Sequence, residues 1–342
     1  MPTIKEIAKR ARVSIGTVSN VINNSAVVSP RRRERVLATI RELDYHPNHV
    51  ARSLKVKQTR MLGMVISDIT NPFFPQLVRG AEDVALRHNY LLITFNTDDK
   101  IDREKQVLAV LRARRVDGIL LVVAPGTGSH GHILNAVKAG IPTVCLDRLP
   151  VGVNVDSVSV DNIGGTRTCV QHLIAMGHRR IGIVTGPTVL QTARERFQGY
   201  TEALKEAGIP VKSELIREGD FRLESGQALG RELLASGDRP SAVFVSNNMM
   251  ALGTLRAMEE LGLRCPEDIA IAMFDDFPLA DAFRPRLTAV AQPAYSIGYR
   301  GAELLIQRIE KKRLDQSPIR IHLGTELKIR DSTAGFRFRS ED

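Results

Sequence analysis

The chain has 342 residues, a net charge of +10 at pH 7 and three cysteines, and 25% of its residues are charged. Its length corresponds to about two or three domains, and the widely spaced Cys145, Cys169 and Cys265 fit neither a disulfide scaffold nor a metal-ligand motif, which indicates a reducing compartment. The N-terminus lacks the apolar stretch of a signal peptide and no apolar run is long enough to span a bilayer, so the sequence excludes secreted and integral membrane classes and predicts a cytoplasmic protein with no membrane partner.

The positive charge is concentrated at the N-terminus. Residues 1–60 hold 13 lysines and arginines against four acids, a net charge of +9, which leaves +1 on the remaining 282 residues. A basic segment joined to a nearly neutral body is typical of a nucleic-acid-binding module attached to a second function.

Residues 3–23 predict two short helices joined by a tight turn. Thr3 and Glu6 form a Thr-x-x-Glu capping box, so the first helix should begin at Ile4. Ser14 can cap the second helix, whose outer face carries small and polar residues: Gly16, Ser19, Asn20 and Asn23. Such a face suits a DNA major groove. The alternative is a helical hairpin with a solvated face.

A third helix is predicted from Pro30 to Asp44, with Ser29 as its cap. The Arg31–Arg33 run lies at its start, where cations oppose the helix dipole, so these arginines are better explained by contact with phosphate. Residues 48–55 form a basic segment after Pro47 that is too short to persist as an isolated helix.

From Met61 onward, apolar runs of strand length alternate with amphipathic stretches. The predicted strands are Leu62–Ser67, Leu91–Phe95, Gly118–Val123, Pro142–Leu146, Ile181–Thr185, Ala242–Ser246 and Ile269–Met273. The predicted helices lie near 74–88, 102–115, 132–139, 162–176, 192–207, 222–236 and 248–262. Two such series, meeting near residue 160, indicate two α/β lobes with parallel sheets and a cleft between them. Residues 331–342 are predicted to form a loose end.

The chain resembles the LacI–GalR family of bacterial transcriptional regulators over nearly its whole length. The motifs that carry the resemblance are Thr3-Ile4, Ile7-Ala8, Val13-Ser14, Thr17-Val18-Ser19, Val21-Ile22-Asn23, Tyr45-x-Pro47-Asn48, Ala51-Arg52-Ser53-Leu54, residues 67–74, Arg196-x-x-Gly199-Tyr200 and Phe274-Asp275-Asp276. Residues 50–56 are especially similar to the purine-responsive branch. The resemblance implies an all-α helix-turn-helix head and an α/β periplasmic-binding-protein-like core of two doubly wound lobes. It also implies a repressor that binds double-stranded operator DNA as a homodimer on a pseudo-palindrome, controlled by a small-molecule effector.

The expected division has four parts. They are a DNA-binding domain at 1–46, a hinge helix and linker at 47–60, an effector-binding and dimerisation core at 61–332, and a tail at 333–342. Within the core, one lobe is expected from 61–160 plus 291–322 and the other from 161–290 plus 323–332.

By position, the resemblance also assigns residues to DNA. Ile15, Gly16 and Asn20 would face bases in the major groove, although Gly16 has no side chain to read them. The phosphate contacts would come from Thr3, Ser14, Thr17, Ser19 and Asn23. Ala51, Leu54 and Lys55 would lie in the minor groove, with Leu54 wedged between central base pairs. The alternative for Leu54 is a packing role within a linker.

Polar and aromatic residues just past predicted strand ends are the effector-site candidates. They are Asp68, Asn71, Phe73, Phe74, Asp147, Arg148, Arg196, Asn247 and Asp275. An arginine fork and a carboxylate suit vicinal hydroxyls or a purine edge, so a sugar, sugar phosphate or purine is expected. Arg196 and Asp275 could instead be a structural ion pair, and the two phenylalanines could be ordinary core. Asn248 stands where the family usually has aspartate.

Two other functions are conceivable from the sequence, an NAD-linked enzyme and a solute-binding protein. Gly126, Gly128 and Gly131 fit the G-x-G-x-x-G pattern of an NAD-linked enzyme, but Pro125 interrupts the approach and the motif follows the third strand of its lobe rather than the first. A transporter's solute-binding protein would need an export signal and no basic head. The prediction is therefore a regulator without catalytic residues, cofactor or metal, for which the resemblance also allows a protein co-regulator, as in catabolite-control relatives.

Overall fold

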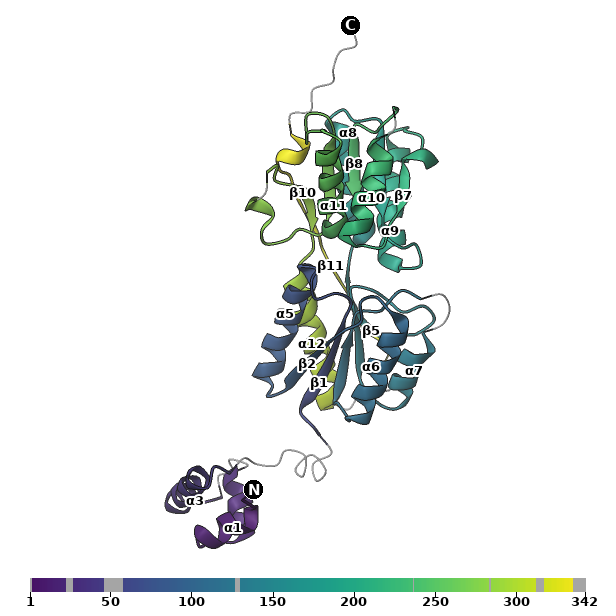
Figure 1. Cartoon of the computed structure of the whole chain (residues 1–342). Helices are drawn as coiled ribbons and strands as arrows, with labels where there is room; N and C mark the ends of the chain where they lie inside the picture. The colour runs from purple at the N-terminus through teal and green to yellow at the C-terminus, as the bar shows by residue number, and fades with distance from the viewer. Residues whose placement is uncertain are drawn as a thin grey trace. The chain divides into compact units, whose positions relative to one another are not determined.

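The computed structural model describes residues 2–22, 27–45, 58–126, 130–235, 237–282, 284–311 and 317–334. The chain divides into two compact units, Met1–Thr59 and Arg60–Asp342 (Figure 1).

The N-terminal unit contains α1 (Ile4–Arg10), α2 (Ile15–Ile22) and α3 (Pro30–Glu42). The capping box is confirmed, because the Thr3 amide donates to Glu6 Oε2 at 2.7 Å and the Glu6 amide donates to Thr3 Oγ1 at 3.3 Å. Ser29 occupies the N-cap of α3 and Pro30 begins the helix, as predicted, but the Ser29 side chain makes no capping hydrogen bond. The three helices pack around a small apolar core made of Ile7, Ala8, Ala11, Val18, Val21 and Val36.

The first lobe of the C-terminal unit is a six-stranded parallel sheet. Its order is β2 (Leu91–Asn96), β1 (Met61–Ile66), β3 (Gly118–Leu121), β4 (Thr143–Leu146), β5 (Asp156–Val160) and β11 (Arg320–Leu323). Its helices are α5 (Phe73–Arg87), α6 (Ile101–Ala113), α7 (Gly131–Lys138) and α12 (Ala294–Lys311).

The second lobe repeats this order. Its sheet runs β7 (Ile216–Glu218), β6 (Ile181–Thr185), β8 (Ala242–Val245), β9 (Ala270–Phe274), β10 (Thr288–Ala291) and β12 (Glu326–Lys328). Among the described strand pairs of this sheet, β10–β12 alone is antiparallel. Its helices are α8 (Asn162–Ala175), α9 (Gln191–Glu206), α10 (Leu223–Leu234) and α11 (Asn248–Glu260), with short 3-10 turns η1 (Ser213–Leu215), η2 (Ala280–Ala282) and η3 (Asp331–Thr333).

The chain passes between the lobes after β5, after β10 and after β11 (Figure 1). Residues that follow strands of both sheets line one common pocket. The carboxyl edges of the two sheets therefore meet, which is where doubly wound sheets bind ligands.

All seven predicted strands and all seven predicted helices of the C-terminal unit are present, with ends shifted by at most two residues. The prediction missed β5, β7, β10, β11, β12 and the long helix α12. Two glycines in α12 obscured its helical pattern. Gly298 is needed there because a Cβ would lie 1.9 Å from the Leu77 carbonyl oxygen of α5.

The loose end predicted at 331–342 is wrong at its start. Ser332 and Thr333 are fully buried, and the Ser332 hydroxyl donates to the Ile271 carbonyl at 2.6 Å while Thr333 bonds Thr288 at 2.8 Å. These bonds fasten the segment to the second sheet, so the tail cannot begin at 333. Residues 335–342 lie outside the described residues, and the other domain limits drawn from the sequence stay predictions.

Among the described helices, none combines the length and the apolar character needed to cross a bilayer.

Candidate functional site

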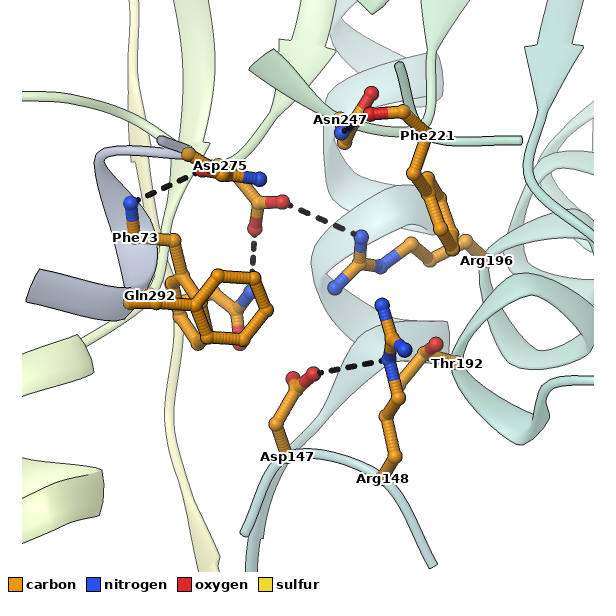
Figure 2. A pocket seen from close by; sticks show the side chains of 11 residues that line it. Phe73, Asp147, Arg148, Thr192, Arg196, Phe221, Asn247, Asp275 and Gln292 are labelled. Carbon is orange, nitrogen blue, oxygen red and sulfur yellow. Dashed lines mark hydrogen bonds and ion pairs between the residues drawn. The ribbon is translucent and has the colours of Figure 1, made fainter. Parts of the chain in front are cut away.

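The candidate effector site is a pocket between the two lobes (Figure 2). It is lined by Asn71, Phe73, Phe74, Asp147, Arg148, Thr192, Arg196, Phe221, Asn247, Asp275 and Gln292.

Arg196, on α9, is buried and fixed on several sides. Its Nε donates to Asn162 Oδ1 at 2.9 Å and its Nη1 donates to the Ser246 carbonyl at 2.7 Å. The same Nη1 lies 3.5 Å from Asp275 Oδ2, and the guanidinium carbon lies 3.8 Å from the centre of the Phe274 ring. These contacts hold the guanidinium in one orientation, facing the pocket.

Arg148 enters the pocket from the first lobe, directly after β4. Its Nη1 donates to Asp99 Oδ1 at 2.6 Å and to Ser67 Oγ at 3.0 Å, and its Nε lies 3.7 Å from Asp147 Oδ2. Figure 2 shows the guanidinium groups of Arg148 and Arg196 pointing toward the same space. The Phe221 ring centre lies 5.7 Å from the Arg148 guanidinium carbon and 6.0 Å from that of Arg196, so one aromatic ring lies within cation–π range of both.

Asp147 and Asp275 occupy matching places in the two lobes, at the ends of β4 and β9. Both have a positive φ, 63° and 70°. Asp275 accepts from Gln292 Nε2 and pairs with Arg196. Asp147 Oδ1 is buried and has no hydrogen-bond partner in the described part of the chain.

Burial raises the pKa of Asp147 to about 6, and the nearby charge of Asp275 acts in the same direction. Arg148 and Arg196 oppose the rise without cancelling it. The carboxylate is therefore costly to ionise inside the pocket, and a hydrogen-bond donor placed at Oδ1 would favour its charged form.

Phe73 and Phe74 supply an apolar wall at the start of α5. Their rings meet edge to face with centres 5.2 Å apart, and both side chains belong to the large apolar cluster of the core as well as to the pocket lining. Phe73 and Phe74 therefore belong to the apolar core and to the pocket lining at once. Arg196 and Asp275 likewise have two roles, because they form an ion pair and line the pocket.

The structure brings together every predicted effector residue except Asp68. The Asp68 carboxylate instead accepts from the Thr70 amide at 2.9 Å and hydroxyl at 2.7 Å, closing a local turn. The pocket adds three residues that sequence reasoning missed: Thr192, Phe221 and Gln292. They follow β6, β7 and β10, so the same rule of residues past strand ends would have found two of them had β7 and β10 been recognised.

Asn247 holds the turn from β8 into α11. Its Oδ1 accepts from the Met250 amide at 3.0 Å and its Nδ2 donates to the Phe221 carbonyl at 2.8 Å. The turn therefore does not depend on Asn248, whose amide instead donates to Asn71 Oδ1 at 3.2 Å.

The candidate DNA-contacting side of the head lies on α2. Ile15, Gly16 and Asn20 are exposed, and a Cβ built on Gly16 would approach nothing closer than Ser14 Oγ at 3.8 Å, so packing does not require glycine there. The Ser14 and Thr17 hydroxyls lie 2.9 Å apart, and Ser19 is half-buried. Asn23, Ala51, Leu54 and Lys55 lie outside the described residues.

The glycine motif does not have the setting of a dinucleotide site. Four residues, 122–125, separate β3 from Gly126, whereas a dinucleotide loop follows its strand directly. Residues 127–129 of the motif lie outside the described residues. Within the described ranges, no cluster of three or more His, Cys, Asp or Glu side chains could hold a metal ion.

Two family models match the chain: bacterial regulatory proteins of the lacI family at residues 3–48, and a periplasmic binding protein-like domain at residues 170–333. The chain is 37% identical to the ribose operon repressor of Halalkalibacterium halodurans, covering 98% of both chains. It is 36% identical to the transcriptional repressor PurR of Vibrio vulnificus, covering 97% of this chain and 98% of PurR. The lac repressor dimer bound to operator and the anti-inducer ONPF matches 98% of this chain and 99% of its own, with 28% identity and a TM-score of 0.86. The head, the two-lobed core and these relatives together show that the chain belongs to the LacI family and is a DNA-binding transcriptional regulator.

Proposed function

We propose that this regulator binds a pseudo-palindromic operator as a homodimer and changes its operator affinity when a small neutral sugar occupies the pocket between the lobes. The observation that carries the choice of ligand is the balance of charge in the pocket. Arg148 pairs with Asp99 and Asp147, and Arg196 pairs with Asp275.

This balance argues against an anionic ligand. Each guanidinium already has a carboxylate partner, so a phosphate group entering the pocket would meet Asp147 and Asp275 without an unmatched cation to neutralise it. A neutral sugar is therefore proposed ahead of a sugar phosphate.

The unpaired polar atoms match hydroxyl groups. Asp147 Oδ1 and Gln292 Oε1 are buried acceptors, and Arg148 Nε is a buried donor, each without a hydrogen-bond partner among the described residues. Sugar hydroxyls both donate and accept, so one ring can serve all three. The similarity to a ribose operon repressor makes a pentose, D-ribose, the first ligand to test.

A purine base is the second candidate. Three phenylalanine rings line the pocket, Phe73, Phe74 and Phe221, and such faces stack on flat bases. The similarity to PurR supports including purines in the same screen.

The effector test is calorimetric titration of the full chain with D-ribose, ribose 5-phosphate and hypoxanthine, after a thermal-shift screen of metabolites. We expect D-ribose to bind and the phosphate ester to bind far more weakly. Asp275→Ala should lose the response, while Asp238→Ala, which removes an exposed carboxylate of the same lobe, should keep it. Binding of the phosphate ester alone would contradict the charge argument. Operator must change D-ribose affinity by the same factor that D-ribose changes operator affinity.

In the head, we propose that Ile15, Gly16 and Asn20 face the major groove and that Thr3, Ser14, Thr17, Ser19 and Asn23 contact phosphates. Ala51, Leu54 and Lys55 would lie in the minor groove. Operator selection from a random duplex pool, followed by competition with a scrambled duplex, tests this assignment. Leu54→Ala should weaken specific binding by about a few kcal/mol while sparing nonspecific binding, because the wedge contributes only to a kinked duplex. Equal affinity for selected and scrambled duplexes would exclude sequence-specific recognition.

A further inference from the structure

Hydrogen bonds join the two lobes near the pocket. Arg222 Nη2 of the second lobe donates to the Asp98 carbonyl of the first at 3.0 Å, and this bond is exposed. Another bond lies buried beside the pocket. Asn71 follows β1 of the first lobe, and Asn248 is the first residue of α11 in the second lobe. Asn248 Nδ2 donates to Asn71 Oδ1 at 3.2 Å. Asn71 is 8% exposed and Asn248 is 0% exposed, so water does not compete freely for this bond.

The direction of this bond is fixed by a backbone group. The Phe73 amide donates to the same Asn71 Oδ1 at 3.0 Å, and an amide N–H can only donate. The Asn71 side chain must therefore present its oxygen at this point. Whatever residue stands at 248 must supply a hydrogen to that oxygen, which an asparagine amide does and an ionised aspartate cannot.

The other end of the Asn248 amide supports this assignment. Asn248 Oδ1 is buried and has no hydrogen-bond partner in the described part of the chain. A buried acceptor without a partner destabilises a fold, so the Asn248 side chain stabilises this fold through its N–H₂ group.

We infer that Asn248 is a positioning residue of the effector pocket, whose amide donates across the lobes to Asn71 and stabilises the lobe arrangement in which Asn71 orients the Phe73 wall. The inference rests on the proposed function only for its consequence for ligand affinity. The bond itself can be tested without any ligand.

The test is a pair of isosteric substitutions on the two sides of the bond. Asn248→Asp replaces the donor with an acceptor and sets two oxygens against each other. Asn71→Asp leaves an acceptor for both the Phe73 amide and Asn248. A donor–acceptor role predicts opposite outcomes for the two variants, whereas a general penalty for a buried charge predicts that both do harm. Asn248→Ala removes the donor without adding charge and stands in if Asn248→Asp does not fold.

The readout is the distance between nitroxide labels on Asp102→Cys in the first lobe and Glu259→Cys in the second, measured by double electron–electron resonance. Cys265→Ser removes the partly exposed native thiol, and excess unlabelled protein isolates the pair within one chain. Without sugar, we expect Asn248→Asp and Asn248→Ala to lengthen and broaden the distance, and Asn71→Asp to keep it. The matched control is Thr254→Val, since Thr254 is also buried on α11 but bonds only within its own lobe, to Met250 and Gly226.

A calorimetric arm adds the ligand. The D-ribose dissociation constant should rise about threefold to tenfold in Asn248→Ala, the range of one net hydrogen bond. If D-ribose binds neither the parent nor any variant, the proposed sugar is wrong. The label distances then still test the hydrogen bond between Asn248 and Asn71. Parent-like distances in both Asn248 variants, or lengthening in Asn71→Asp equal to that in Asn248→Asp, would overturn the inference.

Discussion

The two lobes use one backbone device for two electrostatic purposes. Asp147 ends β4 in the first lobe and Asp275 ends β9 in the second, both at positive φ. The Asp147 amide donates to Val158 at 2.9 Å and the Asp275 amide donates to Val290 at 3.0 Å, each on the neighbouring strand. Yet Asp275 is held by Gln292 and Arg196, whereas Asp147 keeps an unpaired oxygen.

The next residue separates the lobes further. Arg148 turns into the pocket and reaches Asp99, while Asp276 pairs with Arg330 at 2.9 Å and Lys328 at 3.0 Å, outside the pocket lining. The ion pairs of Asp276 therefore order segments within the second lobe. The first lobe presents an open acceptor, so we expect it to contribute the contact that changes most when a ligand enters.

Arg196→Ala should have the largest effect of the variants proposed here, because it disrupts a buried ion pair of the second lobe. It leaves the buried Asp275 carboxylate without its cation, and removing one member of a buried ion pair costs about 3–5 kcal/mol of unfolding free energy. D-ribose binding should be lost as well. Denaturant unfolding and calorimetry measure both effects. Arg179→Ala is the control, because Arg179 is exposed on the same lobe and bonds the Ile174 carbonyl. An Arg196→Ala protein with parental stability and binding would remove this pair from the pocket's framework.

Asp276→Asn should separate stability from binding. Burial acts to raise the pKa of Asp276, but hydrogen bonds from Arg330 and Lys328 outweigh it and hold the pKa below its ordinary value. The ionised group stabilises the fold above its ordinary pKa, and this contribution is lost as pH falls through the lower folded pKa. The variant should lose about 1.5–3 kcal/mol of unfolding free energy at pH 7, the range for hydrogen bonds to charged groups.

D-ribose affinity should be unchanged in Asp276→Asn, since Asp276 does not line the pocket. Asp238→Asn, at an exposed ion pair, should change neither quantity measurably. A clear loss of sugar affinity in Asp276→Asn would show that the strand-ordering pairs also control the pocket.

Asp147→Asn should remove a pH dependence of fold stability and of D-ribose affinity that arises from the first lobe. With a folded pKa of about 6, above that of the unfolded chain, Asp147 favours the fold when protonated, and this contribution is lost as pH rises through 6. Sugar binding runs the other way. A hydroxyl donating to Oδ1 favours the ionised form, so affinity should fall by up to about tenfold per pH unit below pH 6.

At pH 8, Asp147→Asn should weaken D-ribose binding by about tenfold and flatten the profile between pH 5 and 7. Calorimetry across that range measures it. Asp102→Asn, an exposed carboxylate on α6, should leave the profile as in the parent. A flat parental profile would mean that Asp147 is not the acceptor.

The pocket was predicted from polar residues that follow strands, so each pocket residue could be predicted only where its strand was recognised. The apolar runs of β4 and β8 predicted these buried strands, and the polar residues that follow them, Asp147 and Asn247, line the pocket. The sequence prediction missed β5 because its Asp-Ser-Val-Ser-Val pattern is typical of a half-exposed strand, although all five residues are buried. Asp156 can be buried there because Arg308, from α12, pairs with it at 2.7 Å, and pairing across 152 positions leaves no local signal.

Short strands hid two pocket residues for the same reason. β7 is three residues long and β10 is the small-residue run Thr-Ala-Val-Ala, so neither has a recognisable period. Phe221 and Gln292 follow these strands and were missed with them. Asp68 was the opposite error: its place after β1 was correct, but a local turn with Thr70 uses its carboxylate.

Gln292→Leu gives the smallest expected effect and the closest test of the comparison between lobes. Gln292 Nε2 donates to Asp275 Oδ1, so its removal leaves Asp275 with an unpaired buried oxygen, the condition that Asp147 already has. We expect D-ribose affinity to fall about threefold, within the range of one net hydrogen bond. Gln198→Leu, at an exposed glutamine of the same lobe that donates to Glu202, is the control for calorimetry. If Gln292→Leu keeps the parental D-ribose affinity, then Arg196 alone orders Asp275, and the contrast between the lobes lies in their arginines rather than in the donors that flank each aspartate.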